Sequence, residues 1–230
     1  MTYFCRSQKI LNTFQTRHTL KIFIPELIGS FLLTLCFSLS AEYSETLRIT
    51  PLAYGAMMMA LMHMTGRSSG YFNPGITLAA ALCGRVERND AITGITAQVF
   101  GALVAAALAA FMRESGGEPV VAMHGNNNTY GAMLAEFFGS FALIYVFLGA
   151  TSGNNHSFAG LASGFCLIAC GFGPGRLSGG AFNPALALGA GIAEVLDLND
   201  LWLYLAGGLG GAAAGATVFT LMNREMVQHH

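Results

Sequence analysis

Long apolar runs alternate with short polar segments along the whole chain. A helix that spans the hydrocarbon core of a bilayer needs about 20 mostly apolar residues. Six segments meet this requirement: Ile22 to Ala41, Ile49 to Gly66, Ala91 to Met112, Tyr130 to Thr151, Ser157 to Gly175 and Leu201 to Asn223. The pattern therefore predicts an all-α, polytopic membrane protein with six transmembrane helices.

Composition and charge agree with this pattern and exclude several functions. Of the 230 residues, 53% are hydrophobic and 10% are charged, against roughly 25% charged in an average soluble domain. The formal net charge of -1 leaves no basic excess to neutralise phosphates, so no nucleic-acid partner is expected. The sequence pairs no nucleophile with a base and shows no metal-ligand spacing. It therefore predicts neither an enzyme nor a bound cofactor or metal.

Two glutamates reveal an internal repeat, because they are the only charged residues inside the six runs. The segment Glu26-Leu-Ile-Gly-Ser-Phe recurs 110 residues later as Glu136-Phe-Phe-Gly-Ser-Phe, and the same offset relates Asn73 to Asn183. A carboxylate inside a span is costly, so both glutamates indicate function. Each copy holds three spans, an odd number, so the second copy enters the bilayer from the opposite side as an inverted repeat.

The repeat and the basic residues together predict the organisation and orientation of the chain. We expect a cytoplasmic tail over 1–21, a first repeat over 22–112, an extracellular loop over 113–129, a second repeat over 130–223 and a cytoplasmic tail over 224–230. Eight Lys and Arg residues lie in the segments on the same side of the membrane as the N-terminus, and three lie on the opposite side. The positive-inside rule therefore places both termini in the cytoplasm, with the protein in a plasma or bacterial inner membrane.

Each repeat also contains an uncharged segment with Asn-Pro near its middle. Asn suits a helix N-cap and Pro suits the first helical position. About ten apolar residues follow each Pro and would extend about 15 Å, which is half the hydrocarbon thickness. We therefore predict two re-entrant half-helices whose N-termini meet near the midplane. The midplane residues are Asn73, Pro74, Gly75, Asn183, Pro184 and Ala185.

This arrangement predicts a pore at the point where the two half-helices meet. Non-helical backbone at that depth requires surrounding protein or a watery cavity. Two helix N-termini and two carboxamide NH₂ groups would repel cations and hold the oxygen of a passing water or alcohol. A water held in this way donates both hydrogens away from the site, which interrupts a proton wire.

The paired Asn-Pro boxes and paired glutamates resemble the aquaporin (major intrinsic protein) family, from about Ile22 to Asn223. The resemblance implies six tilted helices, two half-helices, a pore in each subunit and a homotetramer in the lipid bilayer. It implies water and small neutral solutes as the molecules carried. It also implies that Glu26 and Glu136 accept backbone N–H bonds from the re-entrant loops, which would answer the cost of their burial.

By the same resemblance, four positions form the selectivity constriction: Tyr54, Gly171, Gly180 and Leu186. The family usually has an arginine directly after the second box, and Leu186 stands there in this chain. Two glycines without that arginine imply a wider, more apolar constriction that favours glycerol, urea or ammonia alongside water. A leucine there could also narrow or dewet the pore.

Two further residues have two interpretations each. Arg176, on the outer side before the second re-entrant loop, either returns a cation to the pore mouth or serves as an interfacial anchor. His63, near the cytoplasmic end of the second span, is either a pH-sensitive gate or an ordinary interfacial histidine.

A passive channel is the favoured function, and two alternatives stay open. Inverted repeats with broken helices also build secondary active transporters, but ion coupling would require a charged residue beside Asn73 or Asn183, where the sequence is uncharged. A closed, structural or adhesion member of the same fold is the other alternative, because Leu186 departs from the family pattern.

Overall fold

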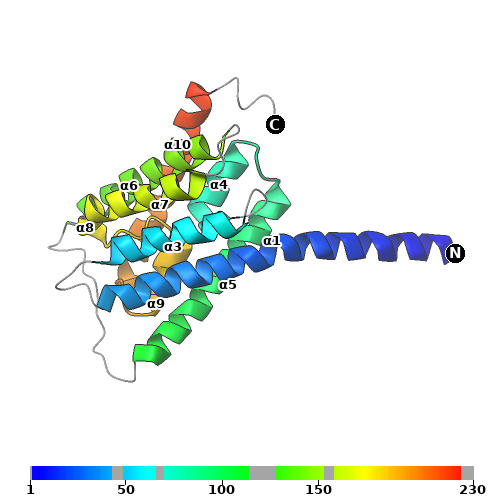
Figure 1. Ribbon diagram of the computed structural model, residues 1–230, viewed down its shortest axis with the longest axis horizontal. Helices are drawn as coiled ribbons and strands as arrows, with labels where there is room; N and C mark the ends of the chain where they lie inside the picture. The colour runs from blue at the N-terminus through cyan, green and yellow to red at the C-terminus, as the bar shows by residue number, and fades with distance from the viewer. Residues whose placement is uncertain (1, 43–48, 66–69, 114–127, 153–157, 224–230) are drawn as a thin grey trace.

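The computed structural model describes residues 2–42, 49–65, 70–113, 128–152 and 158–223, and the secondary structure of these residues is helical. Figure 1 shows the helices packed as one bundle from which the N-terminal part of α1 projects. The elements are α1 (Thr2–Glu42), α3 (Thr50–Thr65), α4 (Pro74–Leu82), α5 (Arg88–Arg113), α6 (Thr129–Ala150), α7 (Ala159–Phe172), α8 (Gly175–Ser178), α9 (Pro184–Ile192), the 3₁₀ turn η2 (Leu198–Asp200) and α10 (Leu201–Met222).

The first helix is longer than the first predicted span. The segment expected as a tail over 1–21 continues α1 from Thr2, because neither Gly nor Pro interrupts it before Pro25. Pro25 lies inside the helix, where it removes one backbone donor. The fifth predicted span is shortened instead: α7 ends at Phe172, because Gly173 and Pro174 follow it.

Three pairs of helices make the most extensive contacts, namely α1 with α5, α6 with α10, and α3 with α7. Glycines allow these close approaches. A Cβ on Gly101 of α5 would lie 2.3 Å from the Leu27 carbonyl oxygen of α1, and a Cβ on Gly211 of α10 would lie 2.1 Å from the Phe137 carbonyl oxygen of α6. These two contacts are related by the 110-residue repeat, so both halves bring backbone against backbone in the same way.

The two short helices α4 and α9 are half-helices of nine residues, about 14 Å long. The half-helix α4 packs on α10, and α9 packs on α5, so each half-helix lies against the last helix of the other repeat. Their N-termini meet inside the bundle. The Asn73 side chain donates to the Phe182 carbonyl at 2.9 Å, and the Asn183 side chain donates to the Phe72 carbonyl at 2.9 Å.

Arginines fix the other ends of the half-helices at opposite ends of the bundle. Arg85, just after α4, donates to Thr151 at the end of α6 at 3.0 Å, and its guanidinium lies 5.2 Å from the Phe219 ring of α10. Arg113, the last residue of α5, donates to the Ala193 carbonyl that ends α9. The two half-helices therefore enter the bundle from opposite ends.

The flank of the bundle is apolar. Within the described residues, four helices are long and apolar enough to cross a membrane (α1, α5, α6 and α10), and the shorter α7 is also apolar. Large hydrophobic side chains point outward from several of these helices, among them Phe100, Phe111, Phe138 and Phe165. Outward apolar side chains on a bundle with buried polar residues are typical of a protein whose solvent is lipid.

Candidate pore and its supports

Each predicted Asn-Pro box caps its half-helix in the same manner. The Asn73 side chain oxygen accepts from the Gly75 N–H at 2.8 Å, and the Asn183 oxygen accepts from the N–H groups of Ala185 and Leu186 at 3.1 and 3.3 Å. Pro74 and Pro184 occupy the first turns. The oxygens of both carboxamides are thus turned back on their own helices, which leaves the NH₂ groups as donors.

The residue before each asparagine has an unusual backbone conformation. Phe72 has φ of 51° and Phe182 has φ of 46°, which lie in the left-handed region that phenylalanine rarely adopts. Each ring fills the space left by a glycine, Gly29 for Phe72 and Gly139 for Phe182. Two contacts stabilise this conformation: the packing of the ring, and the hydrogen bond that the phenylalanine carbonyl accepts from the asparagine of the other repeat.

Glu26 supports the first re-entrant loop through four donors. One carboxylate oxygen accepts from the N–H groups of Gly70 and Tyr71 at 2.9 and 3.0 Å. The other accepts from the Phe72 N–H at 2.7 Å and from the Gln98 side chain amide at 2.7 Å. Glu26 is buried, so these bonds offset the loss of its hydration.

Glu136 supports the second loop through three donors. One carboxylate oxygen accepts from the Ser178 hydroxyl at 2.6 Å and from the Ala181 N–H at 3.1 Å, and the other accepts from the Phe182 N–H at 2.7 Å. The Ser178 hydroxyl also accepts from the Gly180 N–H at 3.1 Å. The carboxylate therefore holds the loop directly and through Ser178.

Sequence reasoning did not single out Gln98 and Ser178. Gln98 is the only side chain amide in its apolar run, a feature that could have identified it. For Ser178, the sequence gives only its pairing with Ser68 at the 110-residue offset. Neither signal gives the partner, since Gln98 lies 72 residues from Glu26 and Ser178 lies 42 residues from Glu136.

Tyr54 lies at the meeting point of the half-helices. Its hydroxyl donates to the Ala181 carbonyl at 3.2 Å. Its ring packs edge-on against Phe37, with 5.6 Å between the ring centroids. Only 2% of Tyr54 is exposed, and the same is true of Asn73 and Asn183, so the midplane is narrow in this conformation.

The two glycines expected at the constriction lie close together, but the space beside them is occupied. A Cβ on Gly171 would lie 2.6 Å from Pro51 of α3, and a Cβ on Gly180 would lie 3.3 Å from Gly175 and 3.5 Å from Gly171. Close backbone packing thus takes up the room that missing side chains would leave. Leu186, where the arginine was expected, is fully buried.

The structure places Arg176 and His63 at the surface. Arg176 lies exposed in the short helix α8, just before the second re-entrant loop, and His63 lies exposed in the last turn of α3. Among the described residues, neither side chain makes a hydrogen bond to Asn73 or Asn183.

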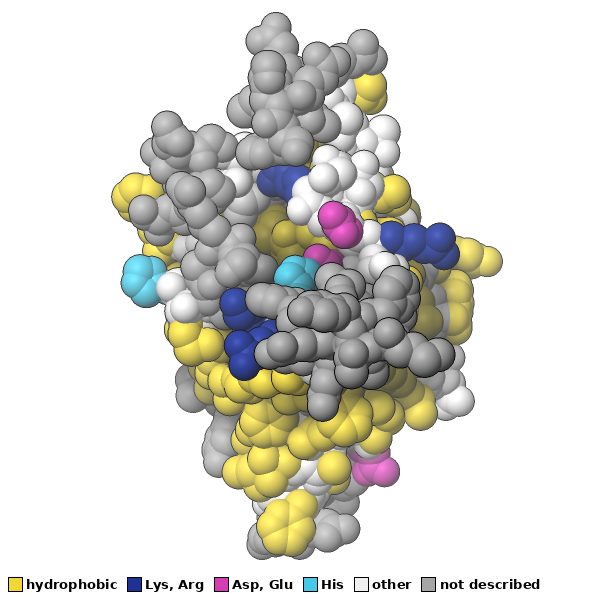
Figure 2. All heavy atoms as spheres, turned by 90° about the vertical axis from the view of Figure 1, so that its right-hand side faces the viewer, with side chains coloured by type: hydrophobic (Ala, Val, Ile, Leu, Met, Phe, Trp, Pro, Cys, Tyr) yellow, Lys and Arg dark blue, Asp and Glu magenta, His cyan; other side chains and the backbone are white. Residues whose placement is uncertain are grey.

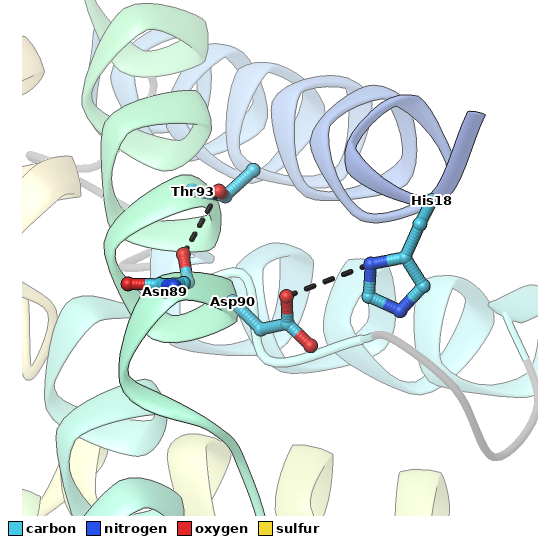
Figure 3. Close-up of polar contacts among 4 residues, drawn as sticks. All are labelled: His18, Asn89, Asp90 and Thr93. Carbon is cyan, nitrogen blue, oxygen red and sulfur yellow. Dashed lines mark hydrogen bonds and ion pairs between the residues drawn. The ribbon is translucent and has the colours of Figure 1, made fainter. Parts of the chain in front are cut away.

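A separate cavity of about 340 Å³ lies beside the first loop, and its wall includes His18, Glu26, Thr77 and Asp90. Figure 2 looks onto the end of the bundle from which α1 projects, where charged and histidine side chains gather around a hollow. Figure 3 shows Asp90 of α5 pointing toward His18 of α1, with 3.6 Å between the His18 Nδ1 and an Asp90 carboxylate oxygen.

In the described part of the chain, two half-helices meet head to head at paired asparagines inside a bundle of six longer apolar helices, and this arrangement defines a membrane channel fold. The family model "Major intrinsic protein" matches residues 13–219. The chain belongs to this family.

Individual relatives agree with the family match. The chain is 28% identical to the aquaporin NIP1-1 of Oryza sativa over 86% of this chain and 73% of the relative. It is 30% identical to the glycerol uptake facilitator protein-like 6 of Lactiplantibacillus plantarum, over 88% of this chain and 98% of the relative. The fold matches the X-ray structure of an aquaglyceroporin from Plasmodium falciparum with a TM-score of 0.75 and 18% identity, over 92% of this chain and 100% of the other.

These findings confirm the predicted fold class, a polytopic helical membrane protein with an inverted repeat and two half-helices. They also identify the chain as a passive channel for water and small uncharged solutes.

Proposed function

We propose that water and small neutral alcohols cross at the midplane, where the paired asparagines present amide donors from two facing helix N-termini. The observation that carries this proposal is the pair of caps: both carboxamide oxygens bond their own helices, so only N–H groups are offered to a solute. An N–H donor holds the oxygen of water or an alcohol, and the positive helix ends repel cations.

Glycerol is the second solute that we propose. Leu186 removes the cation that a strict water filter would present, and one relative is named as a glycerol uptake facilitator-like protein. Arg176 is proposed as an anchor at the outer surface and His63 as an interfacial histidine, because both side chains are exposed.

The test is stopped-flow light scattering on proteoliposomes, which compares water efflux and the entry of glycerol and urea with empty vesicles. We expect water and glycerol to move faster than through lipid, while a trapped pH dye reports no proton leak. The Asn183→Asp variant should carry less solute or admit cations, because a carboxylate replaces the amide donor. Asn89→Asp, at an exposed position outside the pore, adds the same charge and should behave as the wild type.

Two outcomes would contradict the proposal. If the water and solute permeabilities of the wild type and all variants equal those of empty vesicles, the protein has a closed or structural role and does not conduct. If solute uptake depends on an imposed ion gradient, the protein is a secondary transporter instead.

We further propose that both termini are cytoplasmic and that the channel is a homotetramer. The exposed apolar flank supports association in the bilayer, and the distribution of basic residues supports the orientation. A tag at either terminus should be protected in right-side-out cells, and native mass spectrometry in detergent should show four subunits. Accessible tags or a monomer would refute the respective statement.

A further inference from the structure

Two cysteines on α7 are used neither by the pore nor by its supports. Cys166 and Cys170 are four residues apart on the same face of the helix, and their sulfur atoms lie 4.0 Å from each other. Both side chains are half-buried and pack against the apolar core. The spacing alone is too common to predict a site, but the structure brings the two sulfur atoms into contact.

Two thiolates are a complete set of ligands for only a few metal ions. Among the described residues, no group of three or more His, Cys, Asp or Glu side chains lies together, so zinc, which needs three or four protein ligands, has no site there. Cu(I) and Ag(I) are soft ions that prefer thiolate sulfur and are held by two ligands in line. With metal–thiolate bonds of about 2.3 Å, the two sulfurs of such a complex lie about 4.6 Å apart, so this pair would separate by about 0.6 Å.

A metal complex at this pair carries a charge that the protein must stabilise. Each thiol loses its proton when it binds, so two protons leave and the monovalent ion with two thiolates has one net negative charge. A buried negative charge requires a hydrogen-bond donor. The Ser163 hydroxyl is fully buried and has no hydrogen-bond partner among the described residues. Ser163 lies three residues before Cys166, on the same face of α7, so it is an unused donor one turn from the Cys166 thiolate.

The cysteine pair lies away from the paired asparagines. It is in the last two turns of α7, which ends at Phe172. A Cβ on Gly175 would lie 3.1 Å from the Cys170 carbonyl oxygen, so this end of α7 packs against α8. The pair is therefore near the end of the bundle that faces away from the N-terminus, where Figure 1 shows α8.

We propose that Cys166 and Cys170 form a two-coordinate site for a soft monovalent metal ion, Cu(I) or Ag(I), with the Ser163 hydroxyl as the donor that stabilises the bound thiolates. The site is separate from the solute path, so it does not depend on which molecules the channel carries. The folded helix holds the two sulfurs close together, so the ion binds the folded chain more tightly than the unfolded chain and stabilises it.

Silver nitrate is the probe, because Ag(I) needs no reductant to stay monovalent. The full-length protein in detergent and chloride-free buffer is dialysed against Ag(I), and bound silver is measured by elemental mass spectrometry. Cys166→Ser and Cys170→Ser should each lower the affinity of the tightest site by about 100-fold or more, because a single thiolate remains. The matched control is Cys36→Ser, which removes a half-buried cysteine of α1 and should leave that affinity unchanged.

Two measurements on the wild type keep the test independent of the folding of variants. Binding of one Ag(I) at the tight site should release two protons, which a pH indicator in weakly buffered solution counts. The same binding should raise the midpoint of thermal unfolding. A third variant tests the donor: Ser163→Ala should weaken the tight site about tenfold, as loss of a group that hydrogen-bonds a metal ligand does.

The outcomes decide between a chelating pair and separate thiols. One tight ion per chain that is lost in Cys166→Ser and in Cys170→Ser, and kept in Cys36→Ser, supports the inference. If either of the first two variants keeps the wild-type affinity, or if one proton leaves per ion, the thiols bind independently and the inference is wrong. An unchanged affinity in Ser163→Ala would overturn the role of the hydroxyl. None of these results alters the proposed solute path, which the permeability assays test.

Discussion

The two halves of the channel hold their re-entrant loops with the same carboxylate but with different donors. Glu26 receives three backbone N–H groups and the amide of Gln98, which comes from a long helix. Glu136 receives two backbone N–H groups and the hydroxyl of Ser178, the last residue of α8 directly before the loop. The counterpart of Gln98 in the second repeat is Gly208, so that half has no amide at this position.

The comparison teaches which part of the arrangement is required and which part is replaceable. A buried carboxylate needs donors on both oxygens, because its desolvation is otherwise uncompensated. The backbone donors recur in both repeats, since the loop must pass the carboxylate to reach the half-helix. The side chain donor has different origins, because any nearby amide or hydroxyl satisfies the same oxygen.

The largest expected effect comes from Glu26→Gln compared with Glu136→Gln. In Glu26→Gln, the new NH₂ group faces two donors whichever carboxylate oxygen it replaces. In Glu136→Gln, the NH₂ group can take the place of the oxygen that accepts from the Phe182 N–H alone, so it faces one donor. We expect Glu26→Gln to lose about 2–6 kcal/mol of stability and Glu136→Gln about 1–3 kcal/mol. Thermal unfolding in detergent, followed by circular dichroism, measures the difference.

The control for this pair is Glu87→Gln, because Glu87 is exposed and should tolerate the change. Equal losses in both halves, or a greater loss in Glu136→Gln, would mean that the number of donors does not decide the strength of the support.

The next effect should be the same in both halves. A Cβ on Gly29 would lie 2.0 Å from the Phe72 ring, and a Cβ on Gly139 would lie 2.1 Å from the Phe182 ring. Gly29→Ala and Gly139→Ala should each cost about 1–3 kcal/mol, because each ring must move while its backbone stays at positive φ. The midpoint of thermal unfolding measures both, with Gly149→Ala as control since a Cβ there meets nothing within 4 Å. A large difference in the loss of stability between the two variants would show that the two repeats are not structurally equivalent at this position.

A smaller effect should follow removal of the side chain donors. Gln98→Leu removes the donor to Glu26 and Thr77, and Ser178→Ala removes the donor to Glu136. Each should cost about 1 kcal/mol, because the backbone donors to the carboxylate stay in place. The double variant should show the sum, since the two networks share no hydrogen bond among the described residues. Unfolding midpoints of the two single variants and the double variant test this, and strong non-additivity would reveal coupling between the halves.

The smallest effect concerns the ion pair that joins α1 to α5 (Figure 3). His18 is 63% exposed and Asp90 28% exposed at the side chain, with 3.6 Å between them. Asp90→Asn should cost less than about 1 kcal/mol, because exposed ion pairs contribute little and are screened by salt. Unfolding midpoints at low and high salt test this, and a loss above that limit that persists at high salt would show that the contact supports the first half structurally.

The local pattern of the chain was enough to predict the elements of the fold. The predicted spans over 91–112, 130–151 and 201–223 correspond to α5, α6 and α10 within about three residues at each end. Both half-helices begin at the prolines that the sequence indicates, because an N-cap asparagine and a first-turn proline act locally. Helix α1 extends beyond the predicted first span, since a charged segment with no helix breaker can continue a helix.

Other features depend on contacts between distant residues. Tyr54 meets the Ala181 carbonyl across 127 residues, and Gln98 meets Glu26 across 72. Pro51 and neighbouring backbone lie against Gly171 and Gly180, the two glycines predicted at the constriction. Whether a missing side chain leaves space depends on the neighbouring helix, which no local pattern specifies.

The sequence by itself determined the membrane spans, the inverted repeat and the positions of the two boxes, because hydropathy, caps and a fixed offset are properties of the chain. Only the tertiary structure decided which donors satisfy each buried carboxylate and which side chain lies at the midplane. The physical reason is that a buried polar group takes whichever partner packing brings within hydrogen-bonding distance.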